Sequence, residues 1–141
     1  MLRVDKRGTA ALEFVLVAVP FFLLIFAIFD LGRYAITMQS LRMLASAGAR
    51  DVMINCYTDK VVHGTSPSAC ASYSPLPSTT AKQAVAPFLY AGGLTPTLVI
   101  PSLGGGATAL TVTASEPGFA MLMPIWGTAL NAPSASVSIP F

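Results

Sequence analysis

The sequence predicts an α+β protein in which a long N-terminal transmembrane helix extends into a small exported domain with an antiparallel sheet. Two observations lead to this fold class. First, 54% of the 141 residues are hydrophobic and only 10% are charged, whereas average soluble domains are about one-quarter charged. Second, one long apolar run lies near the N-terminus, while short alternating segments punctuated by Gly and Pro occupy the C-terminal half.

Residues 9–29 are predicted to form a transmembrane helix. Their only charged side chain is Glu13, and their helical length matches a hydrocarbon core of about 30 Å. Asp30 and Arg33 follow this run where a secretory signal would have a small-residue cleavage site, so we expect a retained span. Pro20 removes one backbone hydrogen bond and should kink or loosen the helix at mid-span.

Residues 30–55 are predicted to continue the helix outside the membrane. They contain no Pro, and apolar residues recur at three- and four-residue steps. This stripe consists of Leu31, Tyr34, Ala35, Met38, Leu41, Ala45, Ala49, Val52 and Met53. A rod of roughly 70 Å is too long to serve one small core. Half of it is therefore an anchor, and the other half offers its stripe to the C-terminal domain or to neighbouring subunits.

Residues 56–141 are predicted to form the small exported domain. Asn55–Pro77 has the composition of a loop, and Thr79 is expected to cap a short helix, Ala81–Leu89, that Pro87 strains. The predicted strands are Thr97–Ile100, Ala109–Ala114, Met121–Ile125 and Ala135–Ile139. We expect them to form a small antiparallel sheet packed on the upper half of the long helix.

Two cysteines, Cys56 and Cys70, fall in the predicted exported region. In an oxidising compartment they can form a disulfide, closing a loop worth roughly 3 kcal/mol in the chain-entropy model. Two free thiols are the alternative. Their spacing does not fit a zinc site, and the lone His63 supplies no cluster.

The basic surplus of the chain lies entirely in the first eight residues. Residues 1–8 have three bases and one acid, whereas the rest has five of each. This distribution favours a cytoplasmic N-terminus by the positive-inside tendency. It excludes nucleic-acid binding, which needs a basic face on the folded domain.

The sequence predicts neither catalytic residues nor a cofactor or metal site, so we expect no enzyme. One His and many Ser residues provide no nucleophile with a base placed beside it. Gly104–Gly106 lacks the lysine and the following helix of a phosphate loop. Asp30 and Arg33 are expected to be solvated charges that end the span, with an i, i+3 pair as the alternative. Phe119, Met121–Met123 and Trp126 are expected in the core or in subunit contacts.

Glu13 is the residue that most needs a functional explanation, because an unpaired carboxylate is costly within hydrocarbon. It lies five residues after Gly8, which follows the basic pair Lys6 and Arg7. A carboxylate that reaches the nearby cytoplasmic interface, about 8 Å away, is the alternative to a functional role.

These residues resemble the class III signal of type IV pilins and pseudopilins. More narrowly, residues 6–50 resemble the TadE-like family of the tight adherence (Flp pilus) machinery. The matching segments are Lys6–Phe14, Pro20, Phe29–Arg33 and Gly48–Arg50, whereas Ser46-Ala47 stands where the family more often has a charged pair.

The resemblance implies a pilin-like fold and a minor pseudopilin in the bacterial inner membrane. Residues 1–8 would be a cytoplasmic leader, with Lys6 and Arg7 as leader charges, cut between Gly8 and Thr9 by a prepilin peptidase at an unwound backbone. Glu13 and Phe14 would serve assembly and register, with Glu13 pairing with the new amine of Thr9 on an adjacent subunit. The implied partners are the peptidase, other pilins and pseudopilins, the assembly platform and membrane lipid.

Two alternatives remain at this point. One is a membrane-tethered envelope protein whose exported domain binds a ligand or partner and never polymerises. The other is a major fibre subunit, although major subunits of this pilus type are much shorter. An uncut N-terminus would favour the tethered binding protein.

Overall fold

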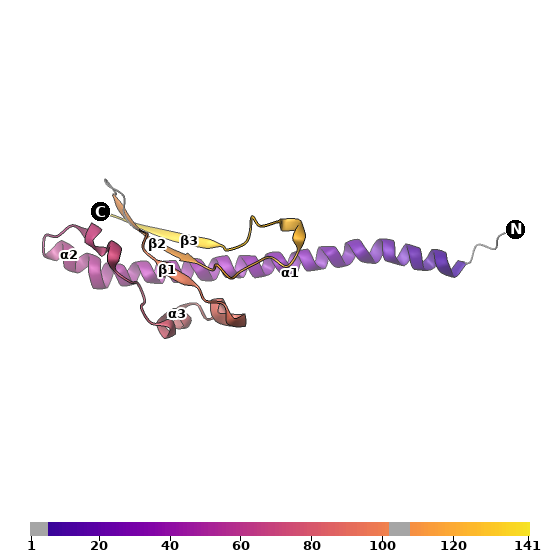
Figure 1. Cartoon of the computed structure of the whole chain (residues 1–141), viewed down its shortest axis with the longest axis horizontal. Helices are drawn as coiled ribbons and strands as arrows, with labels where there is room; N and C mark the ends of the chain where they lie inside the picture. Colours follow the sequence, from indigo (N-terminus) through magenta and orange to yellow (C-terminus); the bar gives the residue numbers. More distant parts are fainter. Residues whose placement is uncertain (1–5, 102–107) are drawn as a thin grey trace.

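The computed structural model describes residues 6–101 and 108–141 and confirms the α+β fold class. The long helix α1 (Lys6–Val52) runs the length of the molecule, and a three-stranded sheet lies along its C-terminal half (Figure 1). The helix continues through Pro20 without interruption, so the loosening expected there does not end it. The N-terminal half of α1 extends alone beyond the folded domain.

The helical rod is longer than predicted. After α1 it continues through a π-helical turn, η1 (Met53–Tyr57), and then α2 (Thr58–Val62), so the start of the predicted loop is helical. The hydroxyl of Thr58 donates to the carbonyl of Met53 at 2.7 Å and supports the wide turn. This turn places Cys56 where it forms a disulfide with Cys70 of the 3-10 helix η2 (Pro67–Ser72).

The second short helix begins and ends differently from the prediction. α3 spans Thr79–Val85, and its cap is Ser78, whose hydroxyl accepts a hydrogen bond from the amide of Ala81 at 3.0 Å. It stops before Pro87, which cannot continue an α-helix, and the 3-10 helix η3 (Pro87–Gly93) follows. The prediction of Thr79 as the cap was therefore one residue late.

The sheet contains β1 (Thr97–Val99), β2 (Ala109–Ser115) and β3 (Ser134–Pro140) in the order β1-β2-β3. Both pairings are antiparallel, and β2 pairs with β3 along its full length, from Ala109 opposite Pro140 to Ser115 opposite Ser134. The predicted strand Met121–Ile125 is wrong. That segment consists of bends and the 3-10 helix η4 (Pro124–Trp126).

The core lies between the sheet and the C-terminal half of α1. Alternate residues of β2 are buried, which are Leu110, Val112 and Ala114, while their neighbours face the other side. From α1 the buried side chains are Leu41, Leu44, Ala45, Ala49 and Val52. The predicted stripe therefore packs against the chain's own sheet over its C-terminal part.

Gly48 lets the sheet approach α1 closely. A Cβ atom at this position would lie 2.9 Å from Cδ2 of Leu98 and 3.2 Å from Cγ1 of Val112. Both neighbours belong to the core, where added volume forces side chains out of their preferred rotamers. Gly48 is thus a packing residue between helix and sheet.

We expect Gly48→Val to destabilise the domain by about 1–3 kcal/mol, the usual cost of overpacking a core. Gly32→Val is the matched control, because a Cβ at Gly32 in the same helix has no neighbour within 4 Å in the part of the chain that the structure describes. Thermal unfolding of the full chain in detergent micelles, followed by near-ultraviolet circular dichroism, measures both. Equal stability of the two variants would contradict this role.

Candidate functional site

The predicted cleavage and assembly residues lie on the part of α1 that extends beyond the domain. α1 begins at Lys6, so the Gly8–Thr9 bond is in its first helical turn and not in the unwound backbone that was expected. The first-turn amides of a helix have no partner within it, so unwinding this turn breaks few hydrogen bonds. Residues 1–5 and the side chains of residues 6–10 lie outside the described part.

Glu13 and Phe14 are both exposed, as are most of the apolar side chains that follow them. The apolar window within this helix is long enough to cross a membrane, and none of it is buried by the rest of the protein. A soluble core helix would be covered by its own domain, whereas this surface is left for lipid or other helices. The helix therefore suggests membrane anchoring.

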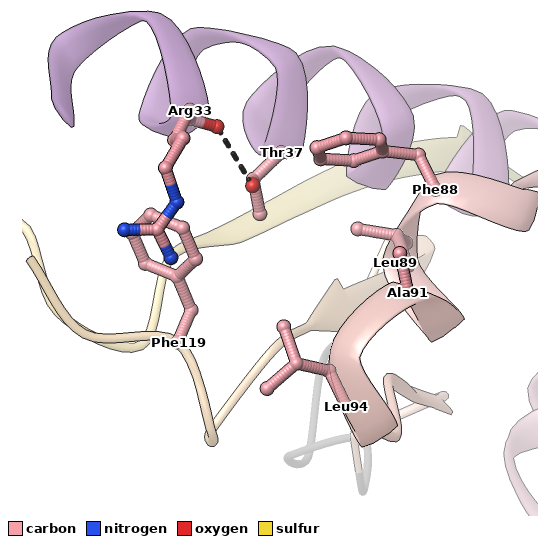
Figure 2. Close-up of a pocket in the computed structure, with 7 residues that line it drawn as sticks. All are labelled: Arg33, Thr37, Phe88, Leu89, Ala91, Leu94 and Phe119. Atoms are coloured by element: carbon pink, nitrogen blue, oxygen red, sulfur yellow. Dashed lines mark hydrogen bonds between the residues drawn. The ribbon is translucent and has the colours of Figure 1, made fainter. Parts of the chain in front are cut away.

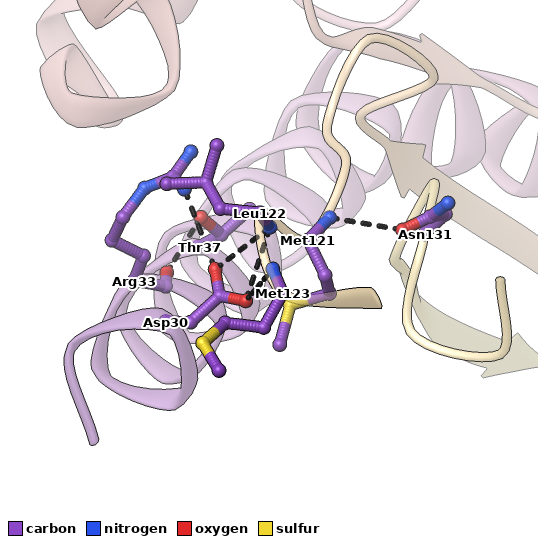
Figure 3. Close-up of polar contacts among 7 residues, drawn as sticks. All are labelled: Asp30, Arg33, Thr37, Met121, Leu122, Met123 and Asn131. Atoms are coloured by element: carbon purple, nitrogen blue, oxygen red, sulfur yellow. Dashed lines mark hydrogen bonds and ion pairs between the residues drawn. The ribbon is translucent and has the colours of Figure 1, made fainter. Parts of the chain in front are cut away.

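Asp30, the first residue after the apolar run, holds the C-terminal domain against the helix through hydrogen bonds. It is only 2% exposed, and its carboxylate accepts hydrogen bonds from the backbone amides of Leu122, at 3.0 and 3.2 Å, and Met123, at 3.0 Å (Figure 3). The side-chain oxygen of Asn131 accepts from the amide of Met121 at 2.9 Å. Asp30 and Asn131 thus accept hydrogen bonds from three successive backbone amides, which in a β-strand would pair with a neighbouring strand.

Asp30 and Arg33 were expected to be solvated, and for Asp30 this expectation is wrong. The guanidinium of Arg33 lies 3.5 Å from the Asp30 carboxylate, and it also lies 5.4 Å from the ring centre of Phe119. Arg33 remains 43% exposed. Sequence periodicity missed this lock because its partners are backbone amides far along the chain. The one available signal was an acid placed directly at the end of the span.

A cavity of about 260 Å³ lies beside this junction, between α1 and η3 (Figure 2). Its polar lining residues are Arg33 and Thr37, and the hydroxyl of Thr37 donates to the carbonyl of Arg33 at 2.9 Å. The remaining lining is apolar and consists of Phe88, Leu89, Ala91, Leu94 and Phe119. The described lining of the cavity thus offers the guanidinium of Arg33, the hydroxyl of Thr37 and an apolar wall.

Asp51 performs a similar tethering role at the other end of the domain. Its carboxylate accepts hydrogen bonds from the amide of Leu76 at 2.9 Å, the hydroxyl of Tyr73 at 3.1 Å and the side chain of Asn55 at 2.7 Å. Burial, with a further contribution from Asp51, raises the pKa of Tyr73. Together with the Cys56–Cys70 disulfide, these contacts fix residues 67–77 against the helix.

Glu116 is a fully buried acid that the sequence did not single out, although it is the only charged residue after Lys82. Among the described residues, neither carboxylate oxygen of Glu116 finds a well-formed hydrogen bond. Burial raises the pKa of the Glu116 carboxyl above 4.5, and the nearby amides of Gly118 and Thr95 offset part of this effect. Burial and the Glu116 charge also raise the pKa of Tyr90.

We expect Glu116→Gln to stabilise the domain by about 1 kcal/mol at pH 7, because it removes the need to bury a charge. The raised pKa means that the stability contributed by protonated Glu116 is full below pH 4.5 and is lost as pH rises through the folded-state pKa. Unfolding of both proteins from pH 4 to 8 should show the difference growing with pH. A constant difference would contradict it.

Within residues 6–101 and 108–141, no group of three or more His, Cys, Asp or Glu side chains is placed to hold a metal ion. The lone histidine, His63, lies 3.3 Å from Asp59 on the exposed helix α2.

No curated protein and no solved structure matches the chain. The family described as TadE-like protein matches residues 8–50, from the predicted cleavage glycine to Arg50. This match confirms the resemblance to the TadE-like family over residues 8–50. The strands of the sheet lie outside the matched residues. Residues 8–50 are thus similar to TadE-like proteins, and this similarity suggests involvement in a tight adherence pilus system.

Proposed function

We propose that this protein is a minor pseudopilin of a tight adherence (Flp-type) pilus. The observation that carries the proposal is the family match, which begins at Gly8 and covers both Glu13 and the exposed apolar helix. In this arrangement residues 9–29 span the inner membrane with the N-terminus in the cytoplasm. The sheet domain lies on the periplasmic side, where an oxidising environment suits the Cys56–Cys70 disulfide.

The proposed mechanism is assembly and not turnover. A prepilin peptidase cuts after Gly8 on the cytoplasmic face, which removes the leader and leaves a free amine on Thr9. The carboxylate of Glu13 on a neighbouring subunit then pairs with that amine. Because each charge alone is costly near hydrocarbon, pairing favours one axial register between adjacent helices. The other partners are pilins, pseudopilins and the assembly platform.

The exposed surface of α1 supports this mechanism. Phe14 and the apolar side chains that follow it are available along the whole length of the span. A helix with such a surface can bundle with other helices after leaving the membrane, as a fibre subunit must. A subunit that initiates, caps or regulates the fibre needs this shared helix and a domain of its own.

Intact mass spectrometry of the membrane-extracted chain tests the processing step. We expect a mass that lacks residues 1–8 when the cognate peptidase is present, and the full mass when it is absent. Gly8→Leu is expected to keep the leader, since a bulky side chain obstructs the cut. A wild-type chain that retains residues 1–8 in the presence of the peptidase would overturn the proposal.

A further inference from the structure

The segment 121–126, held against α1 by Asp30, has an unusually apolar surface. The side chains of Leu122 and Ile125 are 76% and 63% exposed. Met121, Met123 and Trp126 are half-buried beside them. Large aliphatic side chains exposed together at one end of a domain mark an interaction surface more often than a solvated loop. This segment is called the apolar loop below.

The apolar loop lies at the axial level where the apolar run of α1 ends. Asp30 directly follows Phe29, which is exposed on the predicted span, and it binds the amides of Leu122 and Met123. Figure 1 shows η4 at the end of the domain that faces the N-terminal half of α1. The two hydrogen-bonded amides therefore fix the position of the loop relative to the end of the apolar run on α1.

The charge distribution suits a lipid surface. Residues 117–141 contain no Asp, Glu, Lys, Arg or His, so the loop can enter the interfacial region without desolvating a charge. The nearest acid, Asp30, is already buried and hydrogen-bonded. Aromatic residues such as Trp126 are enriched at membrane–water interfaces, where part of the ring meets lipid.

We propose that the apolar loop inserts into the interfacial region of the exported-side leaflet, beside the transmembrane helix. Lipid is favoured as the occupant because the loop begins where the lipid-facing surface of α1 ends. The contact adds a second attachment point, so the domain has a fixed tilt and rotation relative to the bilayer. This proposal rests on the membrane anchoring that is part of the proposed function.

Trp126 is the only tryptophan of the chain, so its fluorescence reports on the loop directly. The full chain is reconstituted at low density in vesicles of phosphatidylethanolamine and phosphatidylglycerol. The acyl chains are brominated near the headgroup or near the bilayer centre. We expect shallow bromines to quench Trp126 at least twofold more strongly than deep ones. Absence of quenching by shallow bromines would overturn the proposal.

The matched variants test whether the two exposed side chains cause the insertion. Leu122→Ser with Ile125→Ser should lower quenching by shallow bromines at least twofold. Ile54→Ser with Val62→Ser replaces side chains that are 72% and 75% exposed at the far end of the rod, and should leave quenching unchanged. Equal quenching in both double variants would overturn the proposal.

Flotation of the same vesicles separates this proposal from the anchoring on which it rests. A chain that fails to float with vesicles contradicts membrane anchoring itself. A chain that floats but shows no lipid quenching of Trp126 contradicts only the apolar loop. Trp126 could also be protected from bromine quenching only while the protein is dense in the bilayer, and lose this protection on dilution in lipid. That result would show that a second copy covers the loop, and it would also overturn the lipid assignment.

Discussion

Glu13→Val is expected to abolish pilus assembly while the protein remains in the membrane and is still cleaved after Gly8. In the proposed mechanism, the substitution removes the carboxylate that pairs with the amine of Thr9 on the neighbouring subunit, and it leaves the apolar helix fully able to span. Insertion should therefore be unchanged, because Val is more favourable than Glu within hydrocarbon. Electron microscopy of cells should show at least tenfold fewer fibres, with normal amounts of processed protein in membrane fractions.

A variant with its carboxylate moved along the helix is the matched control for this prediction. Glu13→Val combined with Val17→Glu keeps the composition of the span and moves the carboxylate by one helical turn, onto a similarly exposed position. If the carboxylate sets register, this variant should also fail to assemble, whereas Glu13→Asp should retain partial assembly. Normal piliation of cells that carry Glu13→Val would contradict the pairing mechanism.

Asp30→Ala is expected to destabilise the C-terminal domain by about 2–5 kcal/mol, because it leaves buried backbone amides without a hydrogen-bond partner and breaks charge-assisted hydrogen bonds. The amides of Leu122 and Met123 would lose their partner, and Arg33 would lose its pair. Unfolding of the full chain in detergent micelles measures the loss. Quenching of Trp126 by acrylamide should also increase, since the apolar loop would no longer be held against α1.

Two further variants separate the lock from a general effect of charge. Asp30→Asn keeps one acceptor oxygen and should lose less stability than Asp30→Ala. Asp59→Ala removes an exposed acid of α2 and should change stability by less than about 0.5 kcal/mol. Similar stability of the Asp30→Ala and Asp59→Ala proteins would show that the hydrogen bonds of Asp30 contribute little.

Local pattern predicted much of this fold. The apolar run and the three- and four-residue periodicity defined the long helix, and alternation in 109–115 and 134–140 defined β2 and β3 with the correct buried face. These signals work because helix and strand periodicity are imposed by burying one face against a core. The cleavage and register residues came from the resemblance to the class III signal of pilins, which Gly8 and Glu13 carry, and their roles remain predictions.

What the sequence did not reveal depends on contacts between distant residues. Met121–Ile125 has the composition of a β-strand. Three of its backbone amides, however, donate hydrogen bonds to the side chains of Asp30 and Asn131, so they do not pair with a neighbouring strand. The sequence pattern does not predict the burial of Glu116 either, because this burial depends on how the turn after β2 folds over the core. Helix extension to Val62 was hidden by the polar composition of residues 55–62.

The distance along the chain between Asp30 and its partners has a consequence for biogenesis. Met123 lies 93 residues after Asp30, and β3 comes later still. With the proposed topology, the helix is anchored first, and its apolar stripe stays exposed until the strands have crossed the membrane. The domain can therefore fold only after its C-terminal segments have been translocated. A chain stalled in transit presents a bare apolar rod, the kind of surface that envelope chaperones and proteases recognise.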